Sequence, residues 1–387
     1  MRRLLRASFG TRDAANSAMG SMKLGVPISV AVMLACSVVV GCKSKPKAAV
    51  EPAPSVVTAP VAAAAPKLDL VQARAMFKPL PTRFDSATNP ATPAKIALGR
   101  MLYYETRLSK AQELSCNSCH QLDKGGVDGV QFSTGHKSQL GGRNSPTVFN
   151  AAGQVAQFWD GRAPTVEEQA KGPILNPVEM AMPDPAHVLV VLRSIPGYVA
   201  AFKQAFPADK DPISYDNFGN AIGAFERGLV TPTAFDAFVA GKDDALSPAA
   251  RDGLALFMTT GCATCHNGVL VGGAMYMKLG VTAPYQNQKD QGRYDLTKNE
   301  ADRMFFKVPT LRNVAATAPY YHDGSVTDLT TAVQTMAQLQ LGKTLSATDT
   351  ASIISFLQSL SGSVAADYIA KPMLPPSGAT TPKPDRT

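Results

Sequence analysis

The apolar positions that form a clear pattern in this chain follow a helical period. Ile353, Leu357 and Leu360 form a stripe with i, i+4, i+7 spacing. The stripe follows Ser346-Ala-Thr-Asp349, which has the form of a capping box, and it stops near Gly362. Alternating runs of β-branched residues and hairpin turns are few. The pattern therefore predicts an all-α fold that closes with a helix ending near Gly362.

Two segments of the chain repeat the same helix signal. Thr92-Pro93 and Ser247-Pro248 each place a hydroxyl N-cap before a proline at the first helical position. Each segment continues as Gly-x-x-Leu-aromatic and then runs into a Cys-x-x-Cys-His unit. The repeated residues are Gly99, Leu102, Tyr103 and Cys116–His120 in one copy, and Gly253, Leu256, Phe257 and Cys262–His266 in the other. The repeat predicts two related helical domains, residues 68–235 and 236–370.

The segments around these helices differ in composition. Residues 43–67 are rich in Pro and Ala and lack amphipathic periodicity, which predicts a semi-extended tether. Residues 371–387 have a similar composition and predict a disordered tail. The Gly- and Pro-rich segments 121–165 and 267–325 predict long loops that wrap a large apolar group.

The N-terminus has the pattern of an export signal. Basic residues precede the uncharged run from Leu24 to Cys42, so residues 1–42 predict a signal peptide. The run ends Val39-Val40-Gly41-Cys42, which resembles a bacterial lipobox with Cys42 as the lipidated residue. The alternative is an uncleaved membrane anchor, because the run approaches the roughly 20 residues that span a bilayer. Both interpretations predict a periplasmic body that contacts the membrane only through its N-terminal anchor.

The net charge of the chain and the distribution of its charged residues argue against one class of partner. The formal net charge of the 387 residues is +8, and residues 1–42 contribute half of it through five basic residues and one acid. No stripe of Lys and Arg with interleaved aromatics is present in the sequence. We therefore expect no nucleic-acid partner.

The two Cys-x-x-Cys-His units carry the chemistry of the chain. A zinc site needs four ligands, and each isolated unit offers two thiolates and one imidazole. A redox Cys-x-x-Cys is typical of a βαβ context, which the pattern lacks. The remaining interpretation is the attachment signature of c-type haem, in which two thioethers hold the porphyrin and the next residue places its imidazole under the iron. We expect two covalent haem c groups, on Cys116, Cys119 and His120 and on Cys262, Cys265 and His266.

At this point the sequence resembles a known family, the bacterial di-haem cytochrome c peroxidases. The resemblance covers essentially the whole folded body. Its most specific segments are LGRMLYYETRLS, SCNSCH, the long run from STGHKSQLGGR through FWDGR to NPVEM, GCATCHNG and VPTLRNVAATAPYYHDGSV. It implies two cytochrome c-like helical domains, each wrapped around one haem, and an enzyme that reduces hydrogen peroxide to water.

The resemblance also implies the second ligand of each iron. The N-terminal, peroxide-reacting haem of the family often has a second His on a mobile loop in the resting state, and His136 matches it. The alternative for His136 is an ordinary histidine on a surface loop. The C-terminal, electron-transfer haem is a His/Met centre, and the matching sulfur is Met336, with Met275 and Met277 as alternatives in the same domain.

Three further residues match groups that act in the family's reaction. Glu179 in NPVEM matches the acid above the peroxide-reacting haem, where a carboxyl can take a proton from one oxygen and give it to the other. Gln169 lies at its expected place in the same matched run. Trp159 in FWDGR, the only tryptophan of the chain, matches the residue between the two haems. The alternative for Trp159 is a core aromatic, and both roles can hold together.

The resemblance implies additional partners. Family members hold calcium between their haem domains through backbone carbonyls, one Asn side chain and waters, a set of ligands suited to a hard cation. The matching residues are Asn144, Thr317 and Pro319. The implied electron donor is a small c-type cytochrome or a cupredoxin, and a homodimer is expected by analogy.

Two other functions remain as alternatives. A non-catalytic electron carrier would keep both irons six-coordinate, and the match at Glu179 argues against it. A di-haem oxidase that modifies another protein, like the maturation enzymes of methylamine dehydrogenase, has a tyrosine where Met336 stands. Tyr320 and Tyr321 keep this second alternative open.

Overall fold

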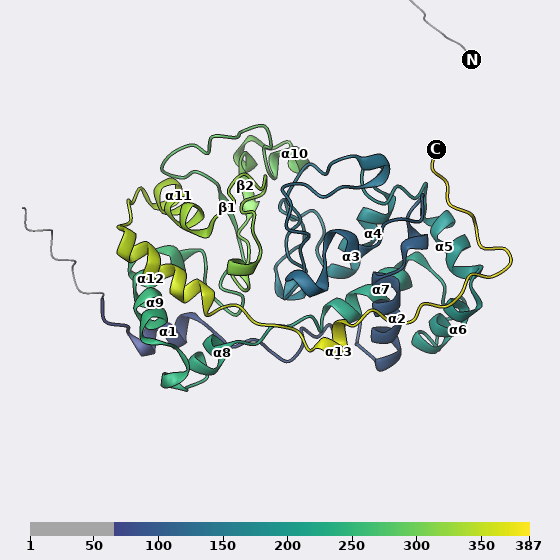
Figure 1. Ribbon diagram of the computed structural model, residues 1–387, viewed down its shortest axis with the longest axis horizontal. Helices are drawn as coiled ribbons and strands as arrows, with labels where there is room; N and C mark the ends of the chain where they lie inside the picture. Colours follow the sequence, from purple (N-terminus) through teal and green to yellow (C-terminus); the bar gives the residue numbers. More distant parts are fainter. Residues whose placement is uncertain (1–65) are drawn as a thin grey trace, which may run out of the picture. The chain divides into compact units, whose positions relative to one another are not determined.

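The computed structural model describes residues 66–387 of the chain (Figure 1). The expected signal peptide, the expected lipidation site Cys42 and all but the last two residues of the expected tether lie outside the described residues.

The described part of the chain is helix-rich. Its α-helices are α1 Leu70–Met76, α2 Pro93–Tyr103, α3 Cys116–Cys119, α4 Val166–Leu175, α5 Pro185–Arg193, α6 Pro196–Ala205, α7 Tyr215–Glu226, α8 Ala234–Val239, α9 Pro248–Thr260, α10 Tyr294–Thr297, α11 Leu329–Leu341, α12 Ala347–Gln358 and α13 Ala366–Ile369. Short 3-10 turns lie between them. The expectation of a purely α fold needs one correction, because β1 Tyr276–Lys278 and β2 Phe305–Lys307 form a small antiparallel pair. Three-residue strands carry too few positions to show alternation in the sequence, so this pair was not predicted.

The predicted helix starts are confirmed. The hydroxyls of Thr92, Ser247 and Ser346 each accept a hydrogen bond from the backbone N–H three residues further on. Proline occupies the first turn of both α2 and α9. Each cap thus satisfies a donor that the helix itself leaves free.

The repeated glycines mark the tightest helix contacts of the fold. α2 crosses α7 in one half of the molecule, and α9 crosses α12 in the other. A Cβ at Gly99 would lie 1.9 Å from the carbonyl oxygen of Ala221, and a Cβ at Gly253 would lie 1.9 Å from that of Ser352. In both helix pairs a glycine therefore allows the two backbones to come close. This shared requirement explains why the glycine is repeated in the sequence.

The hydrophobic core divides mainly between these two helix pairs. One cluster is built around α2, α5, α6 and α7, and the other around α8, α9 and α12. α1 was expected in the N-terminal domain, but its Ala73 and the following Phe77 pack in the second cluster. Phe77 is fully buried, and the N–H of Gly268 in the C-terminal half donates to the carbonyl of Met76 at 3.0 Å, so this contact draws the helix across the expected boundary.

The segment from 371 onward differs from the expectation of disorder. It follows α13 along the N-terminal helices (Figure 1). Arg107 donates to the carbonyl of Pro375, Gln112 donates to that of Pro382, and the N–H of Asp385 donates to the carbonyl of Lys110. The partners of the tail lie far away in sequence, so its own Pro-rich composition could not reveal them.

Within residues 66–387, no single helix is long and apolar enough to cross a membrane, and α5 and α6 meet those criteria only as a pair bent by 104°.

The glycine crossings give a test of the fold. Gly99→Ala should lower the free energy of unfolding by about 1–3 kcal/mol, because the new methyl group overlaps a backbone carbonyl of α7. Gly142→Ala is the control, since a Cβ there meets no atom within 4 Å, its φ is not positive and no proline follows it. The control should gain about 0.4–1 kcal/mol from reduced freedom of the unfolded chain. Urea unfolding of both variants measures the difference, and equal stabilities would refute the crossing.

Candidate functional site

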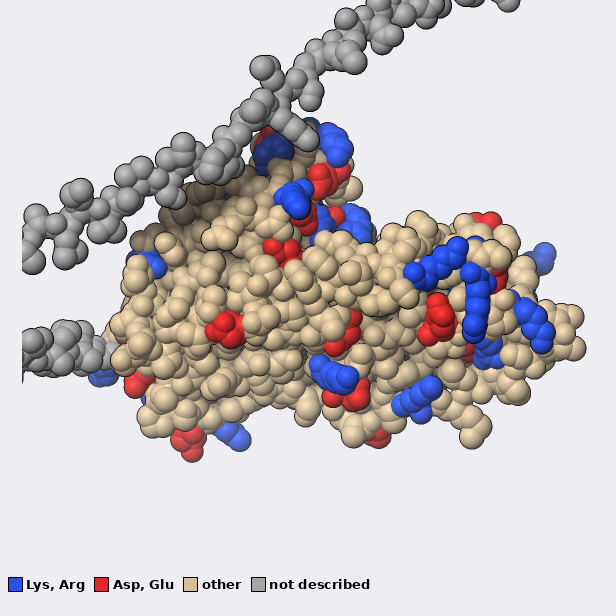
Figure 2. All heavy atoms as spheres, turned by 45° about the horizontal axis from the view of Figure 1, so that its top comes forward, with Lys and Arg blue, Asp and Glu red and all other residues tan. Residues whose placement is uncertain are grey.

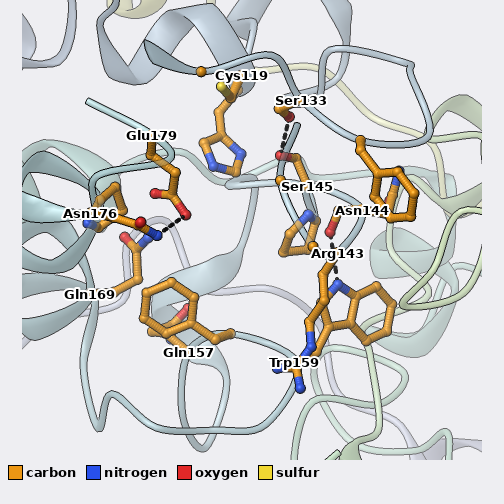
Figure 3. A pocket seen from close by; sticks show the side chains of 18 of the residues that line it. Cys119, Ser133, Arg143, Asn144, Ser145, Gln157, Trp159, Gln169, Asn176 and Glu179 are labelled. Atoms are coloured by element: carbon orange, nitrogen blue, oxygen red, sulfur yellow. Dashed lines mark hydrogen bonds between the residues drawn. The ribbon is translucent and has the colours of Figure 1, made fainter. Parts of the chain in front are cut away.

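A cavity of about 960 Å³ opens in the N-terminal half of the molecule. This volume lies at the upper end of the roughly 300–1,000 Å³ typical of ligand and cofactor sites. Seven of the residues singled out in the sequence line it: Cys116, Cys119, His120, Asn144, Trp159, Gln169 and Glu179. In Figure 3, Glu179, Asn176 and Gln169 approach from one side and Trp159 and Asn144 from the other.

The Cys-x-x-Cys-His unit of this cavity is a single helical turn. α3 starts at Cys116 with a capping box between Ser115 and Ser118, and the N–H of His120 donates to the carbonyl of Cys116 at 3.0 Å. The hydroxyl of Tyr103 donates to the carbonyl of His120 at 2.7 Å. The turn therefore presents two sulfurs and an imidazole in a fixed relation.

The four cysteines within residues 66–387 are free, and none of them forms a disulfide. Burial raises the pKa of the Cys119 thiol and of the Cys262 thiol to about 11. Both thiols are therefore neutral near pH 7, unlike the thiolates of a redox Cys-x-x-Cys. The donor set fits covalent attachment to a porphyrin better than disulfide exchange.

Both predicted proximal histidines are half-buried and favour the neutral form. Burial lowers the pKa of His120, and it lowers the pKa of His266 to about 4. A metal-ligating imidazole must be neutral, so burial prepares both rings for iron. The Nδ1 atoms of both rings are buried and have no hydrogen-bond partner at ordinary distance.

A pair of backbone carbonyls acts on each of these two histidine rings. The carbonyls of Gly126 and Pro146 act on His120 and raise its pKa, and those of Val271 and Pro309 act on His266 in the same way. An iron-bound imidazole normally donates its second N–H to such a carbonyl. The residues present therefore fit a haem iron at each histidine.

A second repeat, which the helix and cysteine patterns did not predict, follows each attachment unit. Pro146 opens Pro-Thr-Val-Phe-Asn150, and Pro309 opens Pro-Thr-Leu-Arg-Asn313. In each copy the Thr hydroxyl donates to a carbonyl next to the histidine's segment, at 2.6 Å and 2.7 Å, and the Asn adopts a positive φ. The signal Pro-Thr-x-x-Asn could have located both carbonyls that face the proximal imidazoles.

The side of the cavity that carries Glu179 is built at the end of α4. Asn176 ends the helix, and its amide donates to Oε1 of Glu179 at 2.9 Å. The other amide atom, Oδ1, accepts from the N–H of Val178, so the donating end is directed at the carboxyl. Burial raises the pKa of Glu179, while Arg162 and the bond from Asn176 counteract it. Gln169 reaches the same cavity from the middle of α4.

His136, the expected second ligand, lies beside the cavity. Its neighbour Gly135 lines the cavity, but the histidine does not. Its N–H donates to the carbonyl of Glu179 at 2.8 Å, and its Nδ1 is 4.0 Å from Glu113. The ring is buried and its Nε2 has no hydrogen-bond partner. A backbone hydrogen bond thus links the loop of His136 to the candidate catalytic acid.

Trp159 joins the two halves of the molecule. Its indole N–H donates to the carbonyl of Asn144 at 2.9 Å, and its own carbonyl accepts from the N–H of Lys307 at 2.8 Å. Asn144 is two residues from Pro146, and Lys307 is two residues from Pro309. A short path of covalent and hydrogen bonds therefore runs from each proximal carbonyl to this side chain.

The predicted Met336 lies on α11. It packs against a small apolar cluster that includes Tyr285 and Phe306, together with Trp159. The end of α11 reaches Gly261, which precedes Cys262, because a Cβ there would lie 3.6 Å from Leu341. Of the two alternatives, Met277 lies in β1 and Met275 directly precedes it.

Of the residues expected to hold calcium, Asn144 lies directly beside Trp159. The N–H of Asn144 donates to the carbonyl of His322 at 2.8 Å, and Gly125 lies against Thr317. Asn144 also donates its amide to the carbonyl of Val130 at 2.9 Å. Among the described residues no group of three His, Cys, Asp or Glu side chains is arranged to hold a metal. A cation here would depend on carbonyl oxygens.

An ion-pair network near Trp159 was not anticipated. Arg143 donates two hydrogen bonds to Asp290, at 2.6 Å and 2.8 Å, and one to Asp160 at 2.7 Å. It thereby connects the loop after His136, the loop of Trp159 and the C-terminal half. No local pattern in the sequence marks Arg143, because its partners lie 17 and 147 residues away.

Comparison with known proteins adds to this geometry. The family described as di-haem cytochrome c peroxidase matches residues 93–244. The chain is 46% identical to the cytochrome c551 peroxidase of Pseudomonas aeruginosa over 319 residues, 81% of this chain and 91% of the relative. It is 45% identical to the cytochrome c551 peroxidase of Nitrosomonas europaea, over 77% of this chain and 88% of the relative. The crystal structure of a MauG-like protein associated with microbial copper homeostasis is 26% identical with a TM-score of 0.67, and covers 76% of this chain and 97% of that one.

The two attachment units can be tested separately. Replacing Cys116 and Cys119 by Ala should remove one covalent haem, and replacing Cys262 and Cys265 should remove the other, because each pair serves its own haem. Intact-mass measurement and the pyridine haemochrome assay count the haems, with each double variant as the control for the other. Retention of two covalent haems in either variant would contradict the assignment.

Proposed function

The chain belongs to the di-haem cytochrome c peroxidase family, and we propose that the cavity around His120 is where it reduces hydrogen peroxide. It is a peroxidase, an oxidoreductase that converts hydrogen peroxide to water with electrons from a protein donor. The observation that carries the assignment of the site is the placement of Glu179 and Gln169 in the same cavity as Cys116, Cys119 and His120.

Two haem c groups are the cofactors that the family implies. Cys116 and Cys119 would hold one and Cys262 and Cys265 the other, with His120 and His266 as iron ligands. When bound, the haems supply one-electron transfer and cleavage of the peroxide bond. All other tasks fall to side chains of this chain.

Glu179 is the proton-transfer group in this proposal. Conversion of peroxide to two waters requires that a proton leave the oxygen nearer the iron and that protons reach the departing oxygen. A carboxylate can accept the first proton and donate it to the second position. The amide of Asn176 holds the carboxyl at 2.9 Å, and Gln169 offers a further amide to the same cavity.

Trp159 and its backbone partners serve electron transfer between the two halves. The hydrogen bonds from the indole to Asn144 and from Lys307 to the Trp159 carbonyl fix the ring between the two Pro-Thr segments. Met336 would be the second ligand of the C-terminal iron, and a thioether there raises the reduction potential relative to a second histidine. A haem held by His266 and Met336 would supply one-electron transfer from the donor toward the N-terminal site.

The remaining partners are proposed on the family alone. The donor is a small c-type cytochrome or a cupredoxin, and on the face in Figure 2 basic and acidic side chains are interspersed on a mostly neutral surface.

Calcium would lie near Asn144, Thr317 and Pro319, and chelation followed by metal analysis tests it. Cys42 would tether the protein in the periplasm, and mass analysis of the membrane fraction tests its lipidation. Oligomeric state, proposed as a homodimer, is tested by sedimentation.

His136 would be the ligand that makes the N-terminal site switchable. Its loop is linked to Glu179 by one backbone hydrogen bond and to the C-terminal half through Arg143. Movement of this loop on reduction would decide whether the iron has a free position.

The alternative of a protein-modifying oxidase can be separated at Met336. Met336→Leu should abolish the methionine-to-iron charge-transfer band of the oxidised protein and lower the potential of the C-terminal haem, because the thioether ligand is lost. Met275→Leu is the matched control and should leave both unchanged. Absence of the band from the unmodified protein would favour the oxidase, with Tyr320 or Tyr321 as the ligand to test next.

Glu179→Gln should lower kcat/KM for peroxide by about 10²–10⁴-fold, because the amide cannot accept the proton. Glu300→Gln, an exposed change outside both cavities, is the control and should retain activity. Steady-state assays with pre-reduced enzyme measure both. Full activity of the Glu179 variant would refute its role.

The pH profile gives an independent measure of the same group. Burial raises the pKa of Glu179 above the ordinary value of 4.5. The rate should therefore fall as the pH is lowered through a pKa above 4.5, since the protonated acid cannot act as a base. That acid limb should disappear in Glu179→Gln, and its persistence would assign it to another group.

A further inference from the structure

Two backbone segments of equal length begin at the hydrogen bonds of Trp159. Asn144–Asn150 belongs to the N-terminal half and Lys307–Asn313 to the C-terminal half. In each, the third residue is the proline whose carbonyl acts on a proximal histidine, and the seventh is an asparagine. Trp159 bonds to the first residue of both segments. The segments are therefore joined in the same register at this end.

Thr231 joins the other ends of the same two segments. Its hydroxyl accepts a hydrogen bond from the side-chain amide of Asn150 at 2.7 Å and donates one to Oδ1 of Asn313 at 2.8 Å. The N–H of Thr231 donates to Oδ1 of Asn150 at 3.1 Å. Both asparagines are buried and Thr231 is fully buried. One hydroxyl, which we call the Thr231 bridge, therefore connects the two halves.

Each asparagine is also fixed to a helix of its own half. The N–H of Asn150 donates to the carbonyl of Leu229, after α7, at 2.8 Å. The N–H of Asn313 donates to the carbonyl of Leu360, after α12, at 3.0 Å. Both asparagines have a positive φ, of 59° and 63°, which Asn tolerates better than most residues. The ends of both segments thus have little freedom to move.

The two copies of this arrangement differ at the residue that faces the asparagine. Thr231 occupies the position in the first copy and Gly362 in the second, each two residues after the leucine. The carbonyl of Gly362 accepts from the amide of Asn313 at 2.8 Å. A Cβ at Gly362 would lie 2.7 Å from the carbonyl oxygen of Thr231, so the second copy has no room for a side chain there. The single hydroxyl of Thr231 therefore serves both copies.

A buried hydroxyl elsewhere in the fold shows what a purely local role looks like. Thr350 is 1% exposed, and its hydroxyl donates to the carbonyl of Ser346, the N-cap of the same helix. The partners of Thr231 instead lie in different halves, each four residues after the proline that faces a proximal histidine. A shift at the Thr231 bridge would move both carbonyls and so reorient both imidazoles.

We propose that Thr231 is a positioning residue for electron transfer between the two halves, because its hydroxyl holds both Pro-Thr segments in one mutual arrangement. The inference rests on the proposed function, in which electrons pass from the C-terminal to the N-terminal site. The hydroxyl touches neither peroxide nor the proximal imidazoles. It acts through the two asparagines, and Trp159 restrains the opposite ends of the same segments.

The test uses the full chain with both haems. Thr231→Val replaces the hydroxyl by a methyl group of similar size, and Thr231→Ser keeps the hydroxyl. Thr350→Val is the matched control, because it removes an equally buried hydroxyl away from the Thr231 bridge. Stopped-flow spectroscopy follows oxidation of the C-terminal haem after peroxide is mixed with protein reduced by one electron. Electron paramagnetic resonance of the oxidised protein records the g values of both irons.

For Thr231→Val we expect electron transfer to slow by about three- to tenfold, because the two segments are no longer held in register. The g values of both irons should shift, since both proximal imidazoles lose the same restraint. Thr231→Ser and Thr350→Val should stay within about twofold of the unmodified rate. An unchanged rate in Thr231→Val would overturn the inference. Equal slowing in Thr350→Val would do the same, because it indicates a general effect of a lost buried hydrogen bond.

Thr231→Ala guards against a Val variant that does not fold. It removes the hydroxyl without placing a new group against the asparagines, and it should slow electron transfer to a similar degree. Transfer at the full rate in this variant would refute the role of the hydroxyl. Failure of the proposed function would look different, because the unmodified protein would then leave peroxide intact. The g values would still report on the Thr231 bridge, and unchanged values at both irons would count against it.

Discussion

A half-buried carboxyl set across a cavity from a half-buried imidazole is the constraint on which the chemistry of this molecule depends. Glu179 is kept there by the amide of Asn176 and by the end of α4, and His120 by a one-turn helix and the hydroxyl of Tyr103. Low polarity favours the neutral imidazole that iron needs and raises the pKa of the acid. The same burial therefore prepares both sides of the site.

The two halves of the molecule share one backbone arrangement but differ in proposed function. Each crosses two helices at a glycine, closes a Cys-x-x-Cys-His turn and presents a proline carbonyl to the proximal histidine. They differ in the second residue proposed for each site, Glu179 in one and Met336 in the other. Trp159 and Arg143 connect the halves, through a backbone hydrogen bond to Lys307 and an ion pair to Asp290. A duplicated cofactor scaffold has thus been specialised by a few side chains.

Local chemistry determines the features that could be predicted from the sequence. The caps at Thr92, Ser247 and Ser346 and the repeated Cys-x-x-Cys-His turns are local, and they were found without structure. Glu179 and Gln169 came only from the family resemblance, because a Glu before a Met has no signature of its own. The course of residues 371–387, the pairing of Arg143 and the position of His136 outside the cavity depend on distant partners. No periodicity or spacing could reveal those contacts.

The central claim is that peroxide reacts only at the iron held by His120. Electron paramagnetic resonance on protein reduced by one electron, before and after addition of one equivalent of peroxide, tests it most directly. The account predicts that the signals of the His120 iron change while the electron is drawn from the His266 iron. Reaction at the His266 iron, or two unchanged low-spin signals with the peroxide intact, would contradict it.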